Sequence, residues 1–227
     1  MLEEFGPGLY AADGPEVSFF GFPYPTRMAA AVLADGTVWV WSPVALDEDL
    51  ARAVEALGVV RHIVSPNKIH HLFLGDWQRR WPDARLHAPP GLARRRPDLR
   101  FDAELGDHPD PAWAADIDQV VFRGSFAMEE VMFFHRPSRT AIVGDLVQRH
   151  DAAAMEGWKG ALMRLDGLVG EHGGTPREWR ASFLDRAAAR AARDRALAWH
   201  ADRLLIAHGA CATSGTAEIL AEALSWI

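Results

Sequence analysis

The sequence predicts a mixed α/β fold in which two β-sheets pack against each other and helices cover their outer faces. Three observations support this prediction. Short apolar runs of strand length recur along the chain, amphipathic segments separate them, and their order is strand-rich unit, helix, strand, helix, meander, helices, strand, helix. No repeat, linker or low-complexity tract interrupts the 227 residues, so we expect residues 1–227 to form a single domain.

The first half of the chain alternates strands with helices. Asp35-Gly36 is a strong hairpin turn between two apolar runs, and Asp47 begins a helix whose first-turn acids suit the helix dipole. Pro82 ends a second helix. The expected elements are a hairpin within residues 17–43 made of strands 28–33 and 37–41, a helix over 47–57, a strand over 59–64, a helix over 72–81 and a strand over 84–88.

The second half begins with a segment rich in Pro, Asp and Arg, residues 91–113, which we expect to be a surface loop with at most a short strand. The Arg94-Arg95-Arg96 run within it is expected to be solvated. Thr175-Pro176-Arg177-Glu178 has the spacing of a helix capping box. The remaining expected elements are a meander of strands 117–122, 130–135 and 140–143, a helix from 175 to about 199, a strand over 203–207 and a helix over 213–226.

Composition excludes several classes of protein. A net charge of −7 argues against a general nucleic-acid binder, and a single cysteine excludes an internal disulfide and suits a reducing compartment. The N-terminus has no basic segment followed by an apolar core, and no run approaches the ~20 apolar residues that span a bilayer. We therefore expect a soluble, cytoplasmic protein with neither a nucleic-acid nor a membrane partner. A homo-oligomer is compatible with the sequence.

Side chains able to bind a metal follow three of the expected strands. His70 and His71 end the segment Ser65-Pro66-Asn67-Lys68-Ile69-His70-His71, Asp145 follows strand 140–143, and His208 follows strand 203–207. Neutral imidazole and carboxylate bind a divalent ion at about 2.0–2.2 Å. We therefore predict that these four side chains gather around one ion.

Each of these residues also has a simpler explanation. The histidine pair is compatible with solvated side chains, Asp145 with a helix N-cap, and His208 with an ordinary loop position. Lys68 is one of only two lysines and follows the sole asparagine, Asn67, in a chain whose other basic residues are arginines. This favours a need for the compact primary amine of lysine, with chance as the alternative.

These residues resemble the metallo-β-lactamase superfamily, whose αββα sandwich carries a [ST]-H-x-H-x-D-H motif after a strand. Residues 65–71 have the length and position of that motif, with Pro66 and Lys68 in place of its first two histidines and His70 in place of its aspartate. Gly144-Asp145-Leu146 resembles the bridging-aspartate strand end, and Ala207-His208-Gly209 resembles the final histidine motif. The family's remaining histidine falls near Ser125 or Phe126, where this chain has none.

The residues 65–71 and the segment 134–140, Phe-His-Arg-Pro-Ser-Arg-Thr, are also similar to a divergent branch of that superfamily described as a domain of unknown function of the 4336 type. The resemblance extends from about Phe20 to the C-terminus and implies a four-layer αββα sandwich. The missing positions belong to the first metal site of the superfamily. The resemblance therefore implies a one-metal variant held by His70, His71, Asp145 and His208, with Lys68 where the first metal normally lies.

The activity implied by this resemblance is that of a metal-dependent hydrolase with a degenerate site. It would use one divalent ion, with zinc as the first candidate and iron or manganese as the others. A site that has lost its function would bind no ion. Asp145 and Lys68 would be catalytic, Lys68 by stabilising negative charge, on a small-molecule substrate that the sequence does not identify. Glu129 and Glu130 are either a further ligand or general base, or solvated acids. The alternatives are a non-catalytic binding or structural descendant of the fold and a thiol enzyme that uses Cys211 with His208.

Overall fold

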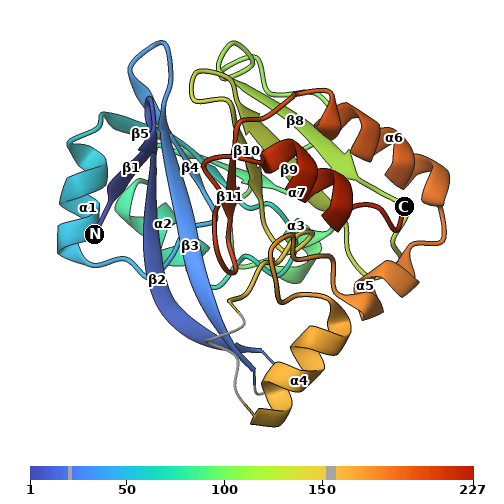
Figure 1. The fold of residues 1–227 in the computed structure, drawn as a ribbon. Coiled ribbons are helices and arrows are strands. Elements are labelled where there is room, and N and C mark those ends of the chain that lie inside the picture. The colour runs from blue at the N-terminus through green and yellow to red at the C-terminus, as the bar shows by residue number, and fades with distance from the viewer. Residues whose placement is uncertain (20–21, 152–156) are drawn as a thin grey trace.

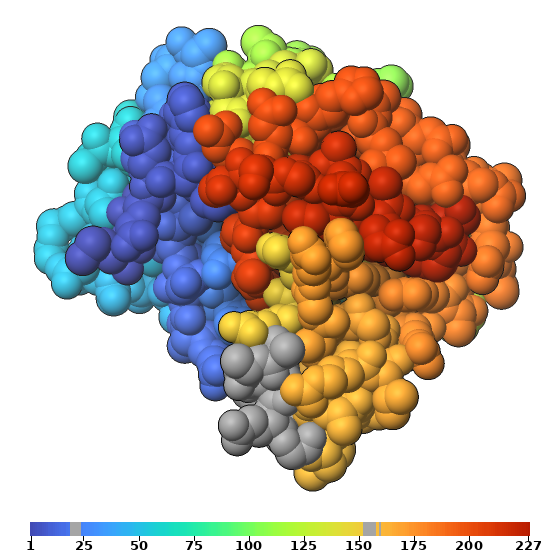
Figure 2. Space-filling model, viewed as in Figure 1, coloured from blue at the N-terminus to red at the C-terminus, as the bar shows by residue number. Residues whose placement is uncertain are grey.

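Two β-sheets pack face to face in the computed structural model of this chain, which describes residues 1–19, 22–151 and 157–227 (Figure 1). Helices cover the outer face of each sheet, so the expected four-layer αββα arrangement is confirmed. In the space-filling view, the N-terminal part of the chain forms one side of the molecule and the C-terminal part the other (Figure 2).

The first sheet has the order β1-β2-β3-β4-β5-β6-β7. Strands β1 to β4 are antiparallel neighbours, and β4 to β7 are parallel neighbours. Their bounds are β1 Glu3–Gly6, β2 Leu9–Phe19, β3 Phe22–Val32, β4 Thr37–Trp41, β5 Val59–Val64, β6 Arg85–Ala88 and β7 Ala103–Glu104.

The second sheet has the order β11-β10-β9-β8. The expected meander forms its antiparallel part, while β10 and β11 run parallel, with Val143 paired to Ile206. Because those two strands lie side by side, the loops at their carboxyl ends begin at the same edge. Their bounds are β8 Ile117–Phe122, β9 Glu130–His135, β10 Thr140–Val143 and β11 Arg203–Ile206.

The helices lie on the two outer faces. Asp47 caps the first of them, accepting a 2.8 Å hydrogen bond from the Leu50 N–H, which satisfies one of the free amides at the helix start. Their bounds are α1 Glu48–Glu55, α2 Leu74–Arg80, α3 Leu92–Arg95, α4 Gly157–Asp166, α5 Arg177–Ser182, α6 Arg186–Leu197 and α7 Thr216–Ala223.

Three apolar clusters separate the layers. The central one joins the inner faces of the two sheets and includes Trp39 and Trp41 from β4 and Phe133 from β9. A second lies between the first sheet and α1, α2 and α3. A third lies between the second sheet and α5, α6 and α7. Burial of apolar surface at all three contacts supplies the main stabilisation of this arrangement.

The single helix expected over 175–199 is wrong, because the structure divides it into α5 and α6. Leu184 and Asp185 both donate backbone hydrogen bonds to the carbonyl of Gly124, and Asp185 then caps α6 by accepting from Ala187 and Ala188. The Thr175 hydroxyl donates to the Leu146 carbonyl at 2.6 Å, so it does not act as a helix cap. Tertiary contacts thus override the local capping signal.

The N-terminal strands are more extensive than the sequence indicated. β1 and most of β2 were not expected, and the hairpin partner of β3 is β2 as well as β4. The segment 91–113 contains the short helix α3 and the two-residue strand β7. Among the helices of the described ranges, none is both long and apolar enough to cross a membrane.

Candidate metal centre

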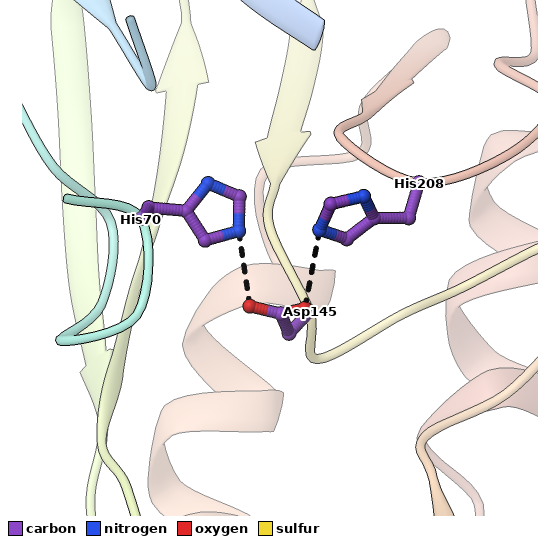
Figure 3. A group of neighbouring side chains, drawn as sticks. All are labelled: His70, Asp145 and His208. Atoms are coloured by element: carbon purple, nitrogen blue, oxygen red, sulfur yellow. Dashed lines mark hydrogen bonds and ion pairs between the residues drawn. The ribbon is translucent and has the colours of Figure 1, made fainter. Parts of the chain in front are cut away.

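Three side chains that can bind a metal converge where the two sheets meet: His70, Asp145 and His208 (Figure 3). The Nε2 atom of His70 lies 3.0 Å from Oδ2 of Asp145, and Nε2 of His208 lies 3.2 Å from Oδ1 of the same carboxylate. One ligand atom from each residue lies within 4.8 Å of those from the other two. Each side chain is less than a tenth exposed. Two imidazoles therefore face one nearly buried carboxylate.

The parallel pair β10 and β11 places two of these residues. Asp145 and His208 each lie two residues beyond Val143 and Ile206, which are partners in the sheet. Gly209 then turns the chain at φ 115°, where a Cβ atom would lie 2.2 Å from the carbonyl oxygen of Arg149. The strand register and this glycine together position the His208 imidazole over Asp145.

His70 comes from the other sheet, in the loop after β5. The Ser65 hydroxyl is within 2.8 Å of the carbonyl oxygens of Asn67 and His70, and the Asn67 side-chain oxygen accepts from the Ile69 and His70 N–H groups. The Nδ1 atom of His70 lies 2.7 Å from Oγ of Ser42. The loop contacts therefore fix the backbone of His70, and Ser42, which follows β4, fixes its ring with Nε2 directed at Asp145.

Glu130 and Asn67 connect the two halves of the centre. Glu130 is fully buried, and its carboxylate accepts from the backbone N–H groups of Gly144 (2.9 Å), Asp145 (2.8 Å) and Leu146 (3.2 Å). The Asn67 amide donates at 2.7 Å to both Glu130 and Asp145. Gly144 leaves room for this carboxylate, since a Cβ atom there would lie 2.9 Å from Glu130 Oε2. Glu130 is therefore neither solvated nor directed at the cavity.

The charged groups of the centre shift one another's pKa values. Burial would raise the pKa of Asp145, but the charges and hydrogen bonds of the facing His70 and His208 imidazoles hold it well below its usual range. Burial would lower the pKa of His208, yet the Asp145 carboxylate raises it. Burial and the neighbouring Asp145 charge raise the pKa of Glu130 to about 7. The Asp145 side chain is therefore an anion.

Both ring nitrogens of His208 face oxygen acceptors. Nδ1 lies 2.6 Å from the carbonyl oxygen of Pro25, so it carries the proton and donates, and Nε2 faces Asp145. A neutral imidazole has only one N–H, so the lone pair on Nε2 would face a carboxylate oxygen. The lone pair and the carboxylate oxygen would repel each other. Either a proton on Nε2 or a cation bound between Nε2 and the carboxylate removes this repulsion. Two imidazoles and a carboxylate form a donor set typical of zinc.

His71 stands apart from this group. Its Nε2 accepts from Nε of Arg95 at 3.1 Å, and Nη1 of Arg96 lies 3.2 Å from Nδ1 and 2.7 Å from the His71 carbonyl oxygen. The structure thus brings together three of the four predicted ligands. The fourth, His71, follows His70 in the loop and points its ring toward α3 instead. The Arg94-Arg95-Arg96 run forms the end of α3 and its cap rather than a loop, while Arg94 and Arg95 are exposed, as expected.

A cavity of about 520 Å³ opens onto the centre. Its polar wall includes the three converging residues together with Lys68, Arg95 and Glu178, and its apolar wall includes Val17, Leu72, Met128 and Trp179. Lys68, the predicted catalytic cation, therefore lines the same space as His70. A mostly apolar cavity with a few convergent polar groups is typical of a small-molecule site.

Some roles were not visible in the sequence. Ser42 contributes through a contact between distant segments that no local pattern marks. Glu130 and Asn67 were noted in the sequence, but the hydrogen bonds that join them to each other and to Asp145 were not visible there. Asp145 is not a helix N-cap, because no helix follows it before residue 152. Cys211 accepts a hydrogen bond from Arg27, and burial raises the pKa of its thiol, which disfavours an activated nucleophile.

Comparison with known proteins supports this fold. A sequence profile described as "Domain of unknown function (DUF4336)" matches residues 17–157. Solved structures that are similar include the DIM-1 metallo-β-lactamase, with a TM-score of 0.67, 11% identity and coverage of 99% of this chain and 96% of that one. An enzyme from Pontibacter korlensis gives a TM-score of 0.65, 10% identity and coverage of 99% and 98%.

The FIM-1 metallo-β-lactamase from Pseudomonas aeruginosa, described as a mono-zinc form, gives a TM-score of 0.60 and 12% identity, with coverage of 99% of this chain and 94% of that one. At such low identity these likenesses show the fold alone. Among curated protein sequences, none matches this chain.

Proposed function

This chain belongs to the DUF4336 family and has the metallo-β-lactamase fold, and from that premise we propose that it is a metal-dependent hydrolase with a single-metal site. His70, Asp145 and His208 would hold the ion. The mono-zinc form described for one similar structure supports a single ion of this kind. Zinc is the first candidate because two imidazoles and one carboxylate are its usual ligands.

One observation carries the proposal: the His208 imidazole donates from Nδ1 to the Pro25 carbonyl and directs Nε2 at Asp145. A backbone carbonyl that accepts from one ring nitrogen fixes the tautomer and leaves the other nitrogen as a metal ligand. The Ser42 hydroxyl, 2.7 Å from Nδ1 of His70, is able to accept from that nitrogen and so leave Nε2 as a ligand. The supporting contacts of both imidazoles therefore suit metal binding.

A divalent ion bound here would supply Lewis acidity and would activate water for attack. Residues of the chain would position the ion and stabilise charge on the substrate. Asp145 keeps a negative charge beside the imidazoles, and Asn67 and Glu130 hold it in place. Lys68 lines the cavity and would stabilise negative charge that develops on the substrate. The apolar residues of the wall lower the polarity around these groups, which strengthens these interactions.

The test is hydrolysis by zinc-loaded protein of an ester, a phosphodiester and an amide probe: 4-nitrophenyl acetate, bis(4-nitrophenyl) phosphate and the β-lactam nitrocefin. We expect turnover of at least one probe, loss on chelation, and a fall in kcat/KM of at least ~100-fold in His208→Ala. Cys211→Ala is the control and should retain activity, whereas a thiol enzyme would lose it. Zinc-loaded protein without turnover on any probe would favour the alternative, a non-catalytic binding descendant of the fold.

A further inference from the structure

Two cations line the cavity without a counter-ion. Lys68 belongs to the loop that carries His70, and Arg95 is the last residue of α3. Among the described residues, no carboxylate forms an ion pair with Lys68 or Arg95. By contrast, most of the other arginines that make side-chain contacts are paired with a carboxylate. Of the two acids that line the cavity, Asp145 faces the imidazoles and Glu178 is exposed on α5. Positive charge in this cavity is therefore available to a ligand.

His71 holds Arg95 in position. Asp98 accepts hydrogen bonds of 2.8 and 2.7 Å from Arg96, Arg96 donates to the carbonyl of His71, and the His71 ring accepts from Nε of Arg95. This contact uses only Nε, so the two terminal nitrogens of the Arg95 guanidinium have no partner among the described residues. A guanidinium held in this way presents a fork that matches two oxygens of a phosphate or carboxylate.

Lys68 complements that fork with a compact charge. It lies next to the loop residues that Asn67 and Ser65 fix, so its backbone is well defined, and its side chain reaches the cavity without a competing acid. The remaining wall is largely apolar, with Val17, Leu72 and Met128 among its residues. The two cations and the apolar wall together favour a ligand that has an apolar body and one anionic group.

We propose that Lys68 and Arg95 form a subsite for the anionic group, a phosphate monoester or a carboxylate, of an apolar substrate. The proposal rests on the proposed function, because it assigns the substrate class of the same cavity. In it, His71 is a positioning residue for Arg95 rather than a metal ligand. The subsite itself needs no metal ion, so anion binding and hydrolysis are separate measurements.

The test is isothermal titration of metal-free protein with hexyl phosphate, hexanoate and 1-hexanol, which share a six-carbon chain and differ in head group. We expect at least one of the two anions to bind ~10-fold or more tightly than the alcohol, and the tighter anion identifies the head group. Lys68→Gln and Arg95→Gln should each weaken its binding by ~5- to 30-fold. Arg94→Gln is the matched control, since it removes the same charge from α3 at an exposed position outside the cavity wall, and should change affinity less than ~2-fold.

The positioning role has its own readout. His71→Ala should weaken anion binding like Arg95→Gln, and the double variant should be no weaker than Arg95→Gln alone. Thermal melting of each variant checks that the fold is retained. The proposal is overturned if 1-hexanol binds as tightly as both anions, or if Lys68→Gln and Arg95→Gln bind the anion like the unmodified chain. Anion binding without hydrolysis would overturn the proposed function but not this subsite. Hydrolysis by a protein that shows no head-group preference would overturn this subsite but not the proposed function.

Discussion

The fully buried carboxylate of Glu130 accepts a 2.8 Å hydrogen bond from the backbone N–H of Asp145. Glu130 begins β9 and Asp145 follows β10, so this bond fixes the turn of chain that carries the central anion of the metal centre. The two neighbouring N–H groups, of Gly144 and Leu146, donate to the same carboxylate. Glu130 thus performs, for a loop, the role that a capping residue performs at the start of a helix.

Glu130→Ala should therefore destabilise the protein. It leaves three buried backbone N–H groups without their acceptor and removes one of the two acceptors of the Asn67 amide, which still donates to Asp145. The expected cost is roughly 3–5 kcal/mol in the free energy of unfolding. Chemical denaturation measures this cost. Glu129→Ala is the matched control, because Glu129 is the adjacent acid, is only partly buried and has no side-chain hydrogen bond to the described residues. Equal effects of the two substitutions would contradict the account of Glu130.

Asn67→Asp changes one atom and should also be severe. The Asn67 amide donates to Glu130 and Asp145 at 2.7 Å, so a carboxylate at this position would place three acids in contact in a buried space. We expect a loss of roughly 3 kcal/mol or more at about pH 7, partly recovered at lower pH as one acid takes up a proton. Chemical denaturation of the unmodified chain and of Asn67→Asp, at about pH 7 and at a lower pH, measures this loss of stability. Unchanged stability would show that the amide is not the bridge described here.

Acid should destabilise the protein through its buried histidines. His135 is fully buried, and burial lowers its pKa to about 4. In the unfolded chain histidine titrates near about 6.5, so the unfolded state takes up the proton first. The stability that the neutral ring contributes is therefore complete above about pH 6.5 and is lost as the pH falls toward about 4, by on the order of 2–3 kcal/mol.

The measurement is urea denaturation of the unmodified chain and of His135→Gln across this range. Glutamine keeps a hydrogen-bonding group near Ser138, which lies 2.7 Å from Nδ1 of His135, but does not titrate. The variant should lose stability less steeply with acid. His87, whose pKa burial also lowers to about 4, contributes to both proteins, so the difference between them isolates His135. Identical slopes would contradict the prediction.

Local patterns predicted most of the fold. The bounds of β5, β8, β9 and β10 match the expected strands because each is an apolar run that ends at a clear turn. The expected helix over 175–199 failed because the carbonyl of Gly124, distant in sequence, accepts the N–H groups of Leu184 and Asp185. Periodicity reports the local preference of a segment and not such a tertiary contact.

In the candidate site, too, local patterns predicted some features and tertiary contacts decided the others. Strand ends located Asp145 and His208, because parallel neighbouring strands bring their carboxyl ends together. Spacing alone could not decide which of His70 and His71 faces Asp145, since adjacent loop residues point their side chains in different directions. That choice depends on contacts across the fold, with Ser42 beside His70 and Arg95 beside His71.

The metal content of four proteins tests the central claim most directly. After incubation with zinc and removal of the free ion, elemental analysis should find about one ion per chain in the unmodified protein and in His71→Ala. His70→Ala and His208→Ala should retain less than ~0.1 ion per chain, because each removes one of the three converging ligands. An unmodified chain that retains no zinc, or a His208→Ala variant that retains as much as the unmodified chain, would contradict the metal centre described here.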